Sequence, residues 1–325
     1  MKQLFWGAAL TFVFVACTER PAFEEEELQQ LVVDRGCGSV EVLEQQLQAD
    51  PTLRATREKI ERTTREMISS GRINALGKIE IPVIVNVLYR LDAENISDEQ
   101  IQSQIDVLNE DFNAKNADVS LTPSLFRSLV ADTDIQFKLE KINRKFSNRR
   151  SWDLSSTMKK SVKGGIDPTD PSRYLNIWVV NKILSLQKLY LGYAQFPGGN
   201  PLTDGVVIGH NYFGRVGNVA PPYDKGRTCT HEVGHWLNLL HTWGDTECGT
   251  DLVHDTPQQT LYNFGCPEYP KYNTCGDSAV EMSMNFMDYT DDACMHLFTV
   301  GQKTRARALF GRRGVRSTFT LDTIR

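Results

Sequence analysis

The sequence has no surplus of basic residues and almost no long hydrophobic runs. Its 36 Lys and Arg stand against 41 Asp and Glu, which gives a net charge of -5. That balance, without any basic run interleaved with aromatics, argues against nucleic acid as a partner. Only one segment, at the extreme N-terminus, is apolar enough to meet a membrane. The 325 residues, 40% hydrophobic and 24% charged, suit one medium-sized globular domain with N-terminal additions.

Residues 1–17 are typical of an export signal. Lys2 supplies a positive start, residues 4–16 form a short apolar stretch, and the small Ala16 precedes Cys17. The stretch is too short for a transmembrane helix. Its end, FVAC, resembles a bacterial lipobox, in which the cysteine is lipidated and becomes the mature N-terminus. We therefore expect an exported protein, either tethered to a membrane through Cys17 or secreted after simple cleavage.

Residues 18–76 are too polar to form a core of their own. An acidic run at 24–27 is followed by charged stretches with scattered leucines, and a helix is expected over 53–69. This composition predicts a pro-segment that rests on a domain formed by residues 77–325. We expect it to be cut between Ser69 and Ala75, at Arg72.

Cys37 lies within this segment, in the motif DRGCGS of residues 34–39. Its flanking glycines let the backbone approach a metal, and a thiolate binds zinc well. The alternative is an unpaired or disulfide-bonded cysteine in a loop. A zinc site formed by residues further along the chain would favour the first interpretation, in which Cys37 binds the metal in a latent precursor.

Histidine is scarce, yet three of the six histidines lie in the eleven residues HEVGHWLNLLH. On a helix, His231 and His235 lie one turn apart on one face, so both imidazoles can reach one ion. His241 reaches the same ion only if the chain turns sharply at Asn238. The zinc-peptidase pattern H-E-x-x-H-x-x-G-x-x-H has glycine there because the backbone is left-handed, a conformation that asparagine also adopts readily.

The globular part alternates strands and helices. Four stretches are expected to be strands: residues 80–89, 135–142, 175–180 and 206–209. Ser97 and Gln100 form a capping box that opens a helix, a shorter helix is expected after Thr122 and Pro123, and another begins near Gly301. The arginines after it are expected to form a solvated face: Arg312, Arg313 and Arg316. The alternation predicts an α/β or α+β sandwich with a mixed sheet.

Two segments resemble the pappalysin family of metzincin zinc peptidases, especially its small bacterial members. They are TCTHEVGHWLNLLHTWGD, residues 228–245, and NFMDYTDDACMHLFTVGQ, residues 285–302. The resemblance implies an α+β, metzincin-like fold: a twisted mixed sheet in an upper subdomain, an active-site helix, and an irregular, disulfide-tied lower subdomain. It also implies a zinc-dependent endopeptidase that acts on proteins or peptides and is made as a latent zymogen.

The resemblance also assigns roles to single residues. Three would be the protein ligands of zinc: His231, His235 and His241. Glu232 would be the general base that takes a proton from the attacking water and passes it to the leaving amine. Met287 would form the methionine turn beneath the metal, and Tyr289 would help to stabilise the transition state.

The remaining cysteines suit an exported protein. By resemblance, Cys248 would pair with Cys275 and Cys266 with Cys294, although four cysteines allow three pairings. Cys229 is left over, and a buried free thiol is expected. A disulfide between Cys229 and Cys37 is the alternative, and it would rule out the metal-binding role of Cys37.

Oxygen-bearing side chains crowd the loop that follows Cys248. Such hard ligands suit calcium, and by resemblance Asp251 and Thr256 match its positions best; the alternative is a solvated acidic loop. Arginine-directed family members carry an aspartate just before the residue matching Cys294, where this chain has Ala293. A preference for a substrate with a basic side chain at P1' would then depend on Asp291 or Asp292.

Two other classes of function compete with a peptidase. One is a catalytically inactive, zinc-containing binding lipoprotein at the cell surface, against which the presence of Glu232 and Tyr289 argues. The other is a zinc enzyme whose third ligand is a carboxylate such as Glu281. His241 and the methionine turn argue against that second class.

Overall fold

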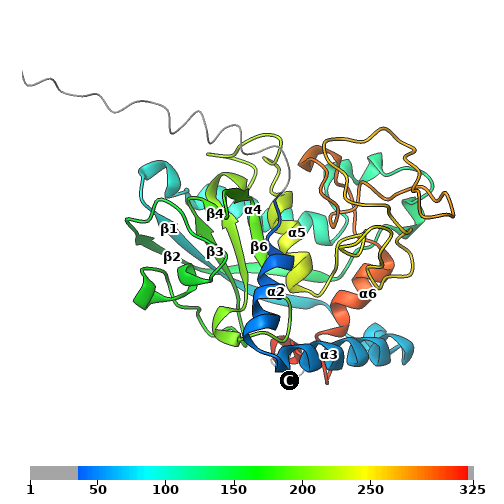
Figure 1. Ribbon diagram of the computed structural model, residues 1–325, viewed down its shortest axis with the longest axis horizontal. Helices are drawn as coiled ribbons and strands as arrows, with labels where there is room; N and C mark the ends of the chain where they lie inside the picture. The colour runs from blue at the N-terminus through cyan, green and yellow to red at the C-terminus, as the bar shows by residue number, and fades with distance from the viewer. Residues whose placement is uncertain (1–35, 321–325) are drawn as a thin grey trace, which may run out of the picture. The chain divides into compact units, whose positions relative to one another are not determined.

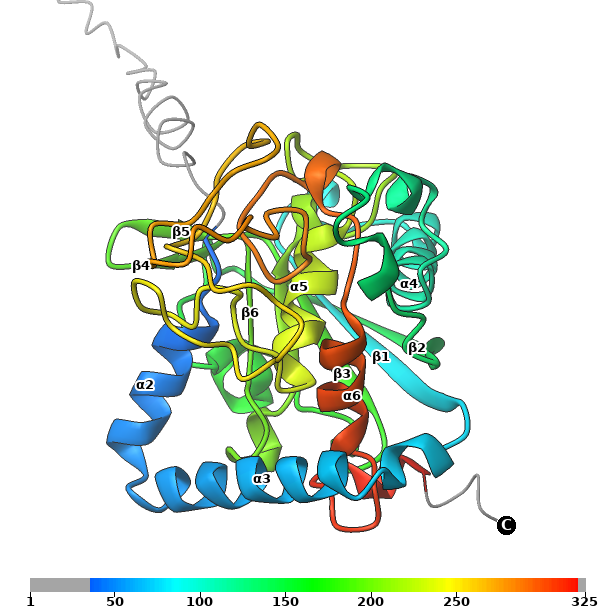
Figure 2. The ribbon, with the colours of Figure 1, turned by 90° about the vertical axis from the view of Figure 1, so that its right-hand side faces the viewer.

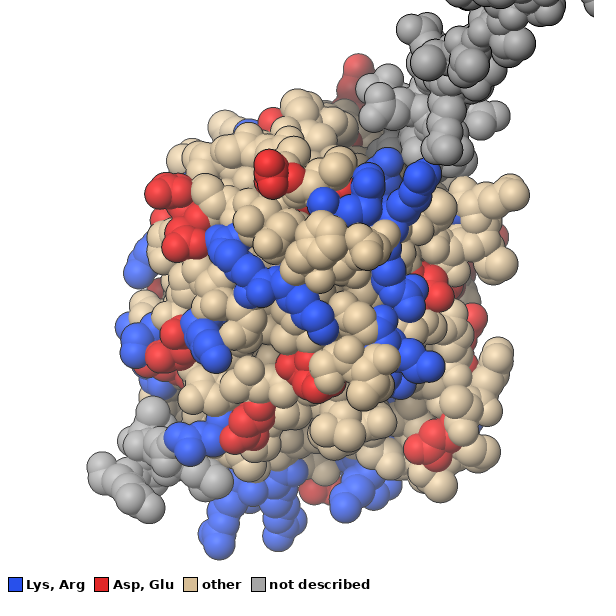
Figure 3. All heavy atoms as spheres, turned by 90° about the vertical axis from the view of Figure 1, so that its left-hand side faces the viewer, with Lys and Arg blue, Asp and Glu red and all other residues tan. Residues whose placement is uncertain are grey.

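The computed structural model describes residues 36–320 (Figure 1). The expected signal peptide and Cys17 lie outside these residues. Within them, no helix is both long and apolar enough to span a bilayer. The face drawn in Figure 3 carries Lys and Arg side chains interspersed with Asp and Glu.

A five-stranded sheet, in the order β2-β1-β3-β7-β6, forms the centre of the fold. The bounds of its strands are Ile79–Tyr89 (β1), Ile135–Phe146 (β2), Leu175–Val180 (β3), Gly192–Ala194 (β6) and Val206–Gly209 (β7). β6 runs antiparallel to β7 and the other pairs are parallel, so the sheet is mixed as expected. β3 and β7 are buried at every position, which explains their unbroken apolar sequences.

Some short elements differ from the expectation. The sequence does not predict β6, nor the hairpin of β4 (Ile183–Ser185) and β5 (Lys188–Tyr190), because three residues carry too little alternation to mark a strand. The helix expected after Pro123 is wrong, since only a 3-10 turn forms at Arg127–Leu129.

α4 (Asp98–Phe112) packs on β2 and begins at the expected cap. The amide of Gln100 donates to Ser97 Oγ at 3.2 Å. The reciprocal half of the capping box is wrong, because the Gln100 side chain donates instead to the carbonyls of His210 and Phe213. Its amide thus fastens the loop after β7 to the helix.

Two helices precede the sheet in sequence, α2 (Ser39–Ala49) and α3 (Thr52–Ser69). α3 matches the helix expected in the pro-segment. Its buried residues include Leu53, Ile60 and Met67, whose spacing of seven places them on one stripe. Figure 2 shows α3 running beneath α5 and α6, so this polar segment does rest on the larger domain.

The chain from residue 237 to 299 is mostly irregular and leads into α6 (Val300–Ala308). Disulfides Cys248–Cys275 and Cys266–Cys294 cross-link it, in the pairing that the family resemblance implies. The solvated face expected beyond α6 is wrong for Arg316. That side chain pairs with Asp204 at 2.9 Å and lies 3.5 Å from the Trp236 ring, because a buried carboxylate needs a cation.

Candidate metal centre

α5 (Arg227–Trp236) carries the first two histidines and ends at the expected turn. Asn238 adopts a left-handed backbone with φ of 66°. The amide of Leu239 then donates to the Gly234 carbonyl at 2.9 Å, which closes the turn and sends the chain back toward the helix. Met287 packs under the helix against Gly234, where any side chain would collide with its sulfur.

The three imidazoles meet at their Nε2 atoms, and all are buried. The separations are 3.1 Å for His231 and His235, 3.0 Å for His235 and His241, and 3.2 Å for His231 and His241. Each Nδ1 faces an acceptor: the Phe286 carbonyl, the Leu239 carbonyl and the Asp245 carboxylate, respectively. Each Nδ1 therefore carries the proton, which leaves three Nε2 lone pairs converging.

These donors fit a zinc ion. Three facing lone pairs repel one another unless a cation lies among them, and burial followed by the charge of His241 lowers the pKa of His235 well below its ordinary value. Zinc–nitrogen bonds of about 2.0–2.1 Å at tetrahedral angles separate the nitrogens by roughly 3.3 Å. Cys37 is the fourth member of the group, with all four ligand atoms within 4.8 Å of one another.

Glu232 lies beside the cluster and is held by two N-terminal residues. Ser39 Oγ donates to its carboxylate at 2.7 Å, and the Cys37 thiol donates to it at 3.5 Å. Burial, and after it the charge of Glu232, raises the pKa of Cys37 well above its ordinary value. Cys229 is a separate buried thiol, so the alternative disulfide with Cys37 does not form. Ser39 was not predicted, because no local pattern links a serine to a carboxylate 193 residues away.

The same N-terminal segment covers the free edge of β6. Gly38 N donates to the Gly192 carbonyl at 2.9 Å, and Ala194 N donates to Ser39 Oγ at 2.8 Å. An unpaired strand edge is a template for an extended peptide. Residues 36–39 occupy that template, so a second peptide cannot pair there while they remain.

Tyr289 follows the methionine turn and faces the cluster. Its ring centroid lies 4.9 Å from that of His241 and 5.7 Å from that of His231. The buried Asp288 accepts bonds from Tyr289 N at 2.8 Å and from Asn263 Nδ2 at 2.7 Å, which fixes the turn. Burial raises the pKa of Asp288 to about 6 despite these bonds. The sequence pattern did not identify Asp288, which holds the turn before Tyr289, or Asp245, which faces Nδ1 of His241.

A second anchor fixes the start of α5. Arg227 pairs with Asp111 of α4 at 3.1 Å and with Asp118 at 2.9 Å. Thr230 Oγ1 also donates to Asp111 at 2.7 Å. These buried bonds set the position of the helix against the sheet, and hence the position of the histidines that follow.

Asp251 and Thr256 lie together in the lower subdomain. Thr256 Oγ1 donates to both Asp251 oxygens, at 2.9 and 2.8 Å. Burial raises the pKa of Asp251 to about 6. Both residues line a cavity of about 160 Å³ together with Thr242, whose buried hydroxyl has no hydrogen-bond partner among residues 36–320. Asp255 is used elsewhere, accepting from Thr299 and Gly301 at the start of α6.

Two other carboxylates have structural partners. Asp292 is buried and accepts from the amides of Lys225 and Arg227 at 2.9 and 3.1 Å, so it caps α5 and is not available for a substrate pocket. Glu281 accepts from Thr260 N and pairs with Lys271 at 3.1 Å, and it is not part of the metal-ligand group.

The turn at Asn238 is also bonded from outside by α3. Glu61 accepts from Asn238 Nδ2 at 2.8 Å and pairs with Arg305 of α6 at 2.7 Å. Arg305 Nε donates to the Asn238 carbonyl at 2.8 Å, which closes a ring of contacts. Arg57 of α3 lies over the Phe196 ring at 4.8 Å. The N-terminal segment is therefore anchored at both the metal cluster and the turn that sets His241.

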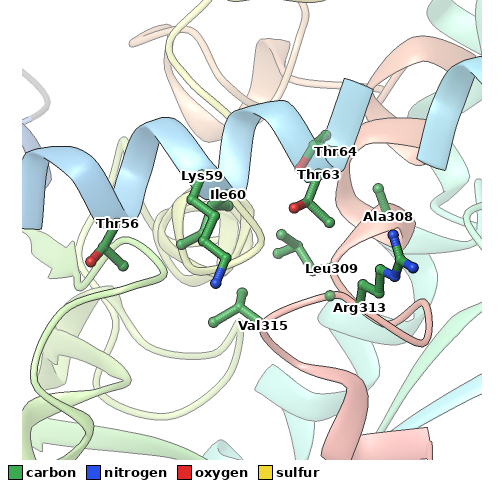
Figure 4. Close-up of a pocket in the computed structure, with 10 residues that line it drawn as sticks. Thr56, Lys59, Ile60, Thr63, Thr64, Ala308, Leu309, Arg313 and Val315 are labelled. Carbon is green, nitrogen blue, oxygen red and sulfur yellow. The ribbon is translucent and has the colours of Figure 1, made fainter. Parts of the chain in front are cut away.

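A cavity of about 210 Å³ lies between α3 and the C-terminal segment (Figure 4). Its walls are Ile60 and Lys59 of α3, and Leu309 and Val315 of the C-terminal segment. It marks incomplete packing where α3 meets the domain and contains none of the metal-ligand residues.

Comparisons with known proteins agree with this site. Residues 158–310 match the model of the M43 peptidase family, which is described as pregnancy-associated plasma protein-A. An extracellular metalloprotease of Verticillium alfalfae is 31% identical over 259 residues, which are 74% of this chain and 83% of that protein. One of Arthroderma benhamiae is 29% identical over 293 residues, 86% of this chain and 85% of that protein.

Solved structures give closer likenesses. Mature mirolysin of Tannerella forsythia, in complex with a cleaved peptide, superimposes with a TM-score of 0.72 and 47% identity, covering 76% of this chain and 97% of that one. A promirolysin mutant of the same organism gives a TM-score of 0.79 and 44% identity, covering 88% of this chain and 97% of that one. The pro form is thus matched over the larger share of this chain.

Proposed function

This chain belongs to the pappalysin family of metallopeptidases, and we propose that His231, His235 and His241 bind its catalytic zinc. It is a zinc metalloendopeptidase with a zymogen form. The observation that carries the ligand assignment is the convergence of three buried Nε2 lone pairs at separations of 3.0–3.2 Å. When bound, zinc supplies Lewis acidity toward water and the peptide carbonyl.

The chain's own groups perform the proton transfer. Glu232 lies beside the cluster on the same helix, and it accepts a proton from the attacking water and delivers it to the leaving amine. The Tyr289 hydroxyl donates a hydrogen bond to the oxygen on which negative charge develops. The free edge of β6 pairs with the extended substrate once residues 36–39 have left.

Latency follows from the same contacts. Cys37 takes the fourth position of the cluster, Ser39 occupies the general base Glu232, and the segment covers the edge of β6. The Cys37 thiol, whose pKa burial and Glu232 raise, would become a thiolate if a divalent cation were bound beside it. We assign residues 18–76 to the pro-segment and 77–325 to the catalytic domain, with cleavage near Arg72.

Metal analysis and peptidase assays test the assignment. We expect the trimmed protein to contain one zinc and to hydrolyse denatured protein. Glu232→Ala should keep the zinc and lose at least 10²-fold in rate, since general base catalysis is worth that much. His241→Ala should lose the metal while Glu281→Ala keeps it. Zinc binding without hydrolysis in the trimmed wild type would instead identify an inactive binding protein.

A structural calcium at Asp251 and Thr256 is a second assignment. Its support is a cavity lined by the buried Asp251 and by Thr242, whose buried hydroxyl has no hydrogen-bond partner among the described residues. Both side chains carry oxygen donors, which calcium prefers. A chelator selective for calcium over zinc should then lower Tm while the zinc content stays constant. An unchanged Tm would show that the cavity binds no cation.

The location of the protein rests on its relatives and its N-terminus. Relatives named extracellular metalloproteases and the apolar residues 1–17 support export. We assign Cys17 as the lipidated residue of a membrane-tethered precursor. Mass spectrometry of the N-terminal peptide distinguishes a lipidated Cys17 from a cleaved, secreted form.

A further inference from the structure

A series of aromatic rings runs from the metal cluster to the protein surface. Trp243 stacks on His241 with centroids 4.3 Å apart and planes 8° apart, and the Tyr289 ring meets Trp243 at 4.7 Å. Beyond Tyr289 lie Tyr262 at 5.7 Å and Phe264 at 6.2 Å, both within 28° of parallel to it. Trp243 is 4% exposed, whereas Tyr262 is 43% and Phe264 37% exposed.

The backbone that presents these two rings is firmly fixed. Asn263, which lies between them in sequence, donates to Asp288 through its backbone amide at 2.8 Å and its side chain at 2.7 Å. The Gly265 carbonyl accepts from Asp291 N at 2.9 Å, and the next residue forms the Cys266–Cys294 disulfide. The rings are therefore held in the open and packed on each other, 4.8 Å apart, rather than exposed by loop motion.

We propose that Tyr262 and Phe264 form a substrate subsite that accepts a bulky apolar or aromatic side chain. A contiguous exposed apolar patch, unlike a single exposed side chain, marks an interaction site, and these two rings pack on each other. Here both rings contact Tyr289, and Tyr289 in turn contacts His231 and His241, so a substrate side chain next to the bond that is cut can reach them. Aromatic walls bind apolar and aromatic side chains by burial and by offset or edge-to-face ring contacts.

The Lys271 ammonium, which donates to the side-chain oxygen of Asn263, is already paired with Glu281 at 3.1 Å. The rings themselves, and not this charge, therefore set the preference of the subsite. This inference rests on the peptidase function. The two rings are separate from the segment of Asp291, Asp292 and Ala293, on which a preference for a basic P1' side chain would depend.

The test is a peptide library cut by the trimmed enzyme. For wild type, Phe or Leu at one substrate position should raise kcat/KM at least tenfold over Ala at that position. Phe264→Ala and Tyr262→Ala should each reduce that ratio several-fold, while Phe264→Leu preserves most of it. Tyr272→Ala removes a more exposed ring, 57% exposed, outside the series and should leave the ratio unchanged.

The outcomes separate failure of the subsite from failure of the peptidase. If no peptide is cut by any variant, the peptidase function itself is wrong. If wild type and Phe264→Ala cut with the same preferences, or if the ring substitutions selectively weaken cleavage of Arg and Lys peptides, the apolar subsite is wrong. Tm measurements with both disulfides intact show whether each variant is folded.

Discussion

The contact of Glu61 with Asn238 and Arg305 predicts a second latch of the zymogen, independent of Cys37. The Glu61 side chain is 16% exposed and the Arg305 side chain 3% exposed, so the pair is largely shielded from water. Glu61→Gln keeps the size of the side chain but removes its charge and leaves Arg305 without a carboxylate. Breaking a buried pair on one side costs several kcal/mol; discounted for partial exposure, we expect about 2 to 3 kcal/mol, or roughly 30- to 150-fold more pro-segment undocking.

Undocking is measured with an added protease in a background that cannot process itself. In Glu232→Ala protein, trypsin at low concentration cuts at Arg72 at a rate proportional to the open fraction. Glu61→Gln should speed that cut by the factor above, whereas Glu58→Gln, an exposed position on the same helix, should not. Equal rates for the two variants would refute the latch.

A double-mutant cycle assigns part of the effect to the turn. Asn238→Gly restores the residue of the zinc-peptidase pattern and removes the side-chain bond to Glu61. Glu61→Gln should therefore cost less in that background than with Asn238 present. Additive effects would show that Glu61 acts through Arg305 alone.

The same latch should weaken in acid. Burial raises the pKa of Glu61, but the bonds and charge of Arg305 outweigh it, so the pKa lies below the ordinary 4.5. A depressed folded pKa gives stability that is present above the unfolded value and lost as pH falls through the folded value. Cleavage of the pro-segment by pepsin, a protease that works in acid, should thus accelerate below about pH 4.5 in the protein with Glu61, and less so in Glu61→Gln.

Three further predictions concern the blocking residues Cys37 and Ser39, the proposed oxyanion donor Tyr289, and the buried Lys159. Cys37→Ala should shorten the latency of the full-length precursor, and Ser39→Ala should do so to a smaller extent. Latency is measured as the delay before peptide product is released, and an unchanged delay in both variants would contradict the blocking role of residues 36–39. Tyr289→Phe should lower kcat by about 100-fold with little change in KM, as for loss of an oxyanion donor; a rise in KM alone would assign Tyr289 to substrate binding. Burial lowers the pKa of Lys159 to about 7, although Asp204 opposes the shift. Since the unfolded chain keeps that proton up to about pH 10.5, stability should rise with pH between 7 and 10.5. Urea unfolding at pH 7.5 and 9 should show the rise in wild type and a smaller one in Lys159→Met, and equal pH dependence of both proteins would contradict it.

Local signals were sufficient for several elements of four residues or more. β3 and β7 have the expected bounds and α3 nearly so, because an unbroken apolar run marks a buried strand and a seven-residue apolar spacing marks an amphipathic helix. The three-residue strands β4, β5 and β6 were missed for the opposite reason. β6 matters most among them, since its edge is where the pro-segment lies.

The sequence by itself determined which imidazoles could share an ion. The spacing of His231 and His235 on a helix, and a residue at position 238 that tolerates left-handed backbone, are local properties. Only the tertiary structure decided what surrounds them: Ser39 on Glu232, Glu61 on Asn238, and Tyr262 beside Tyr289. These partners are far apart in sequence and leave no local periodic signal, since hydrogen bonds and ring contacts between distant segments depend on how the whole chain packs.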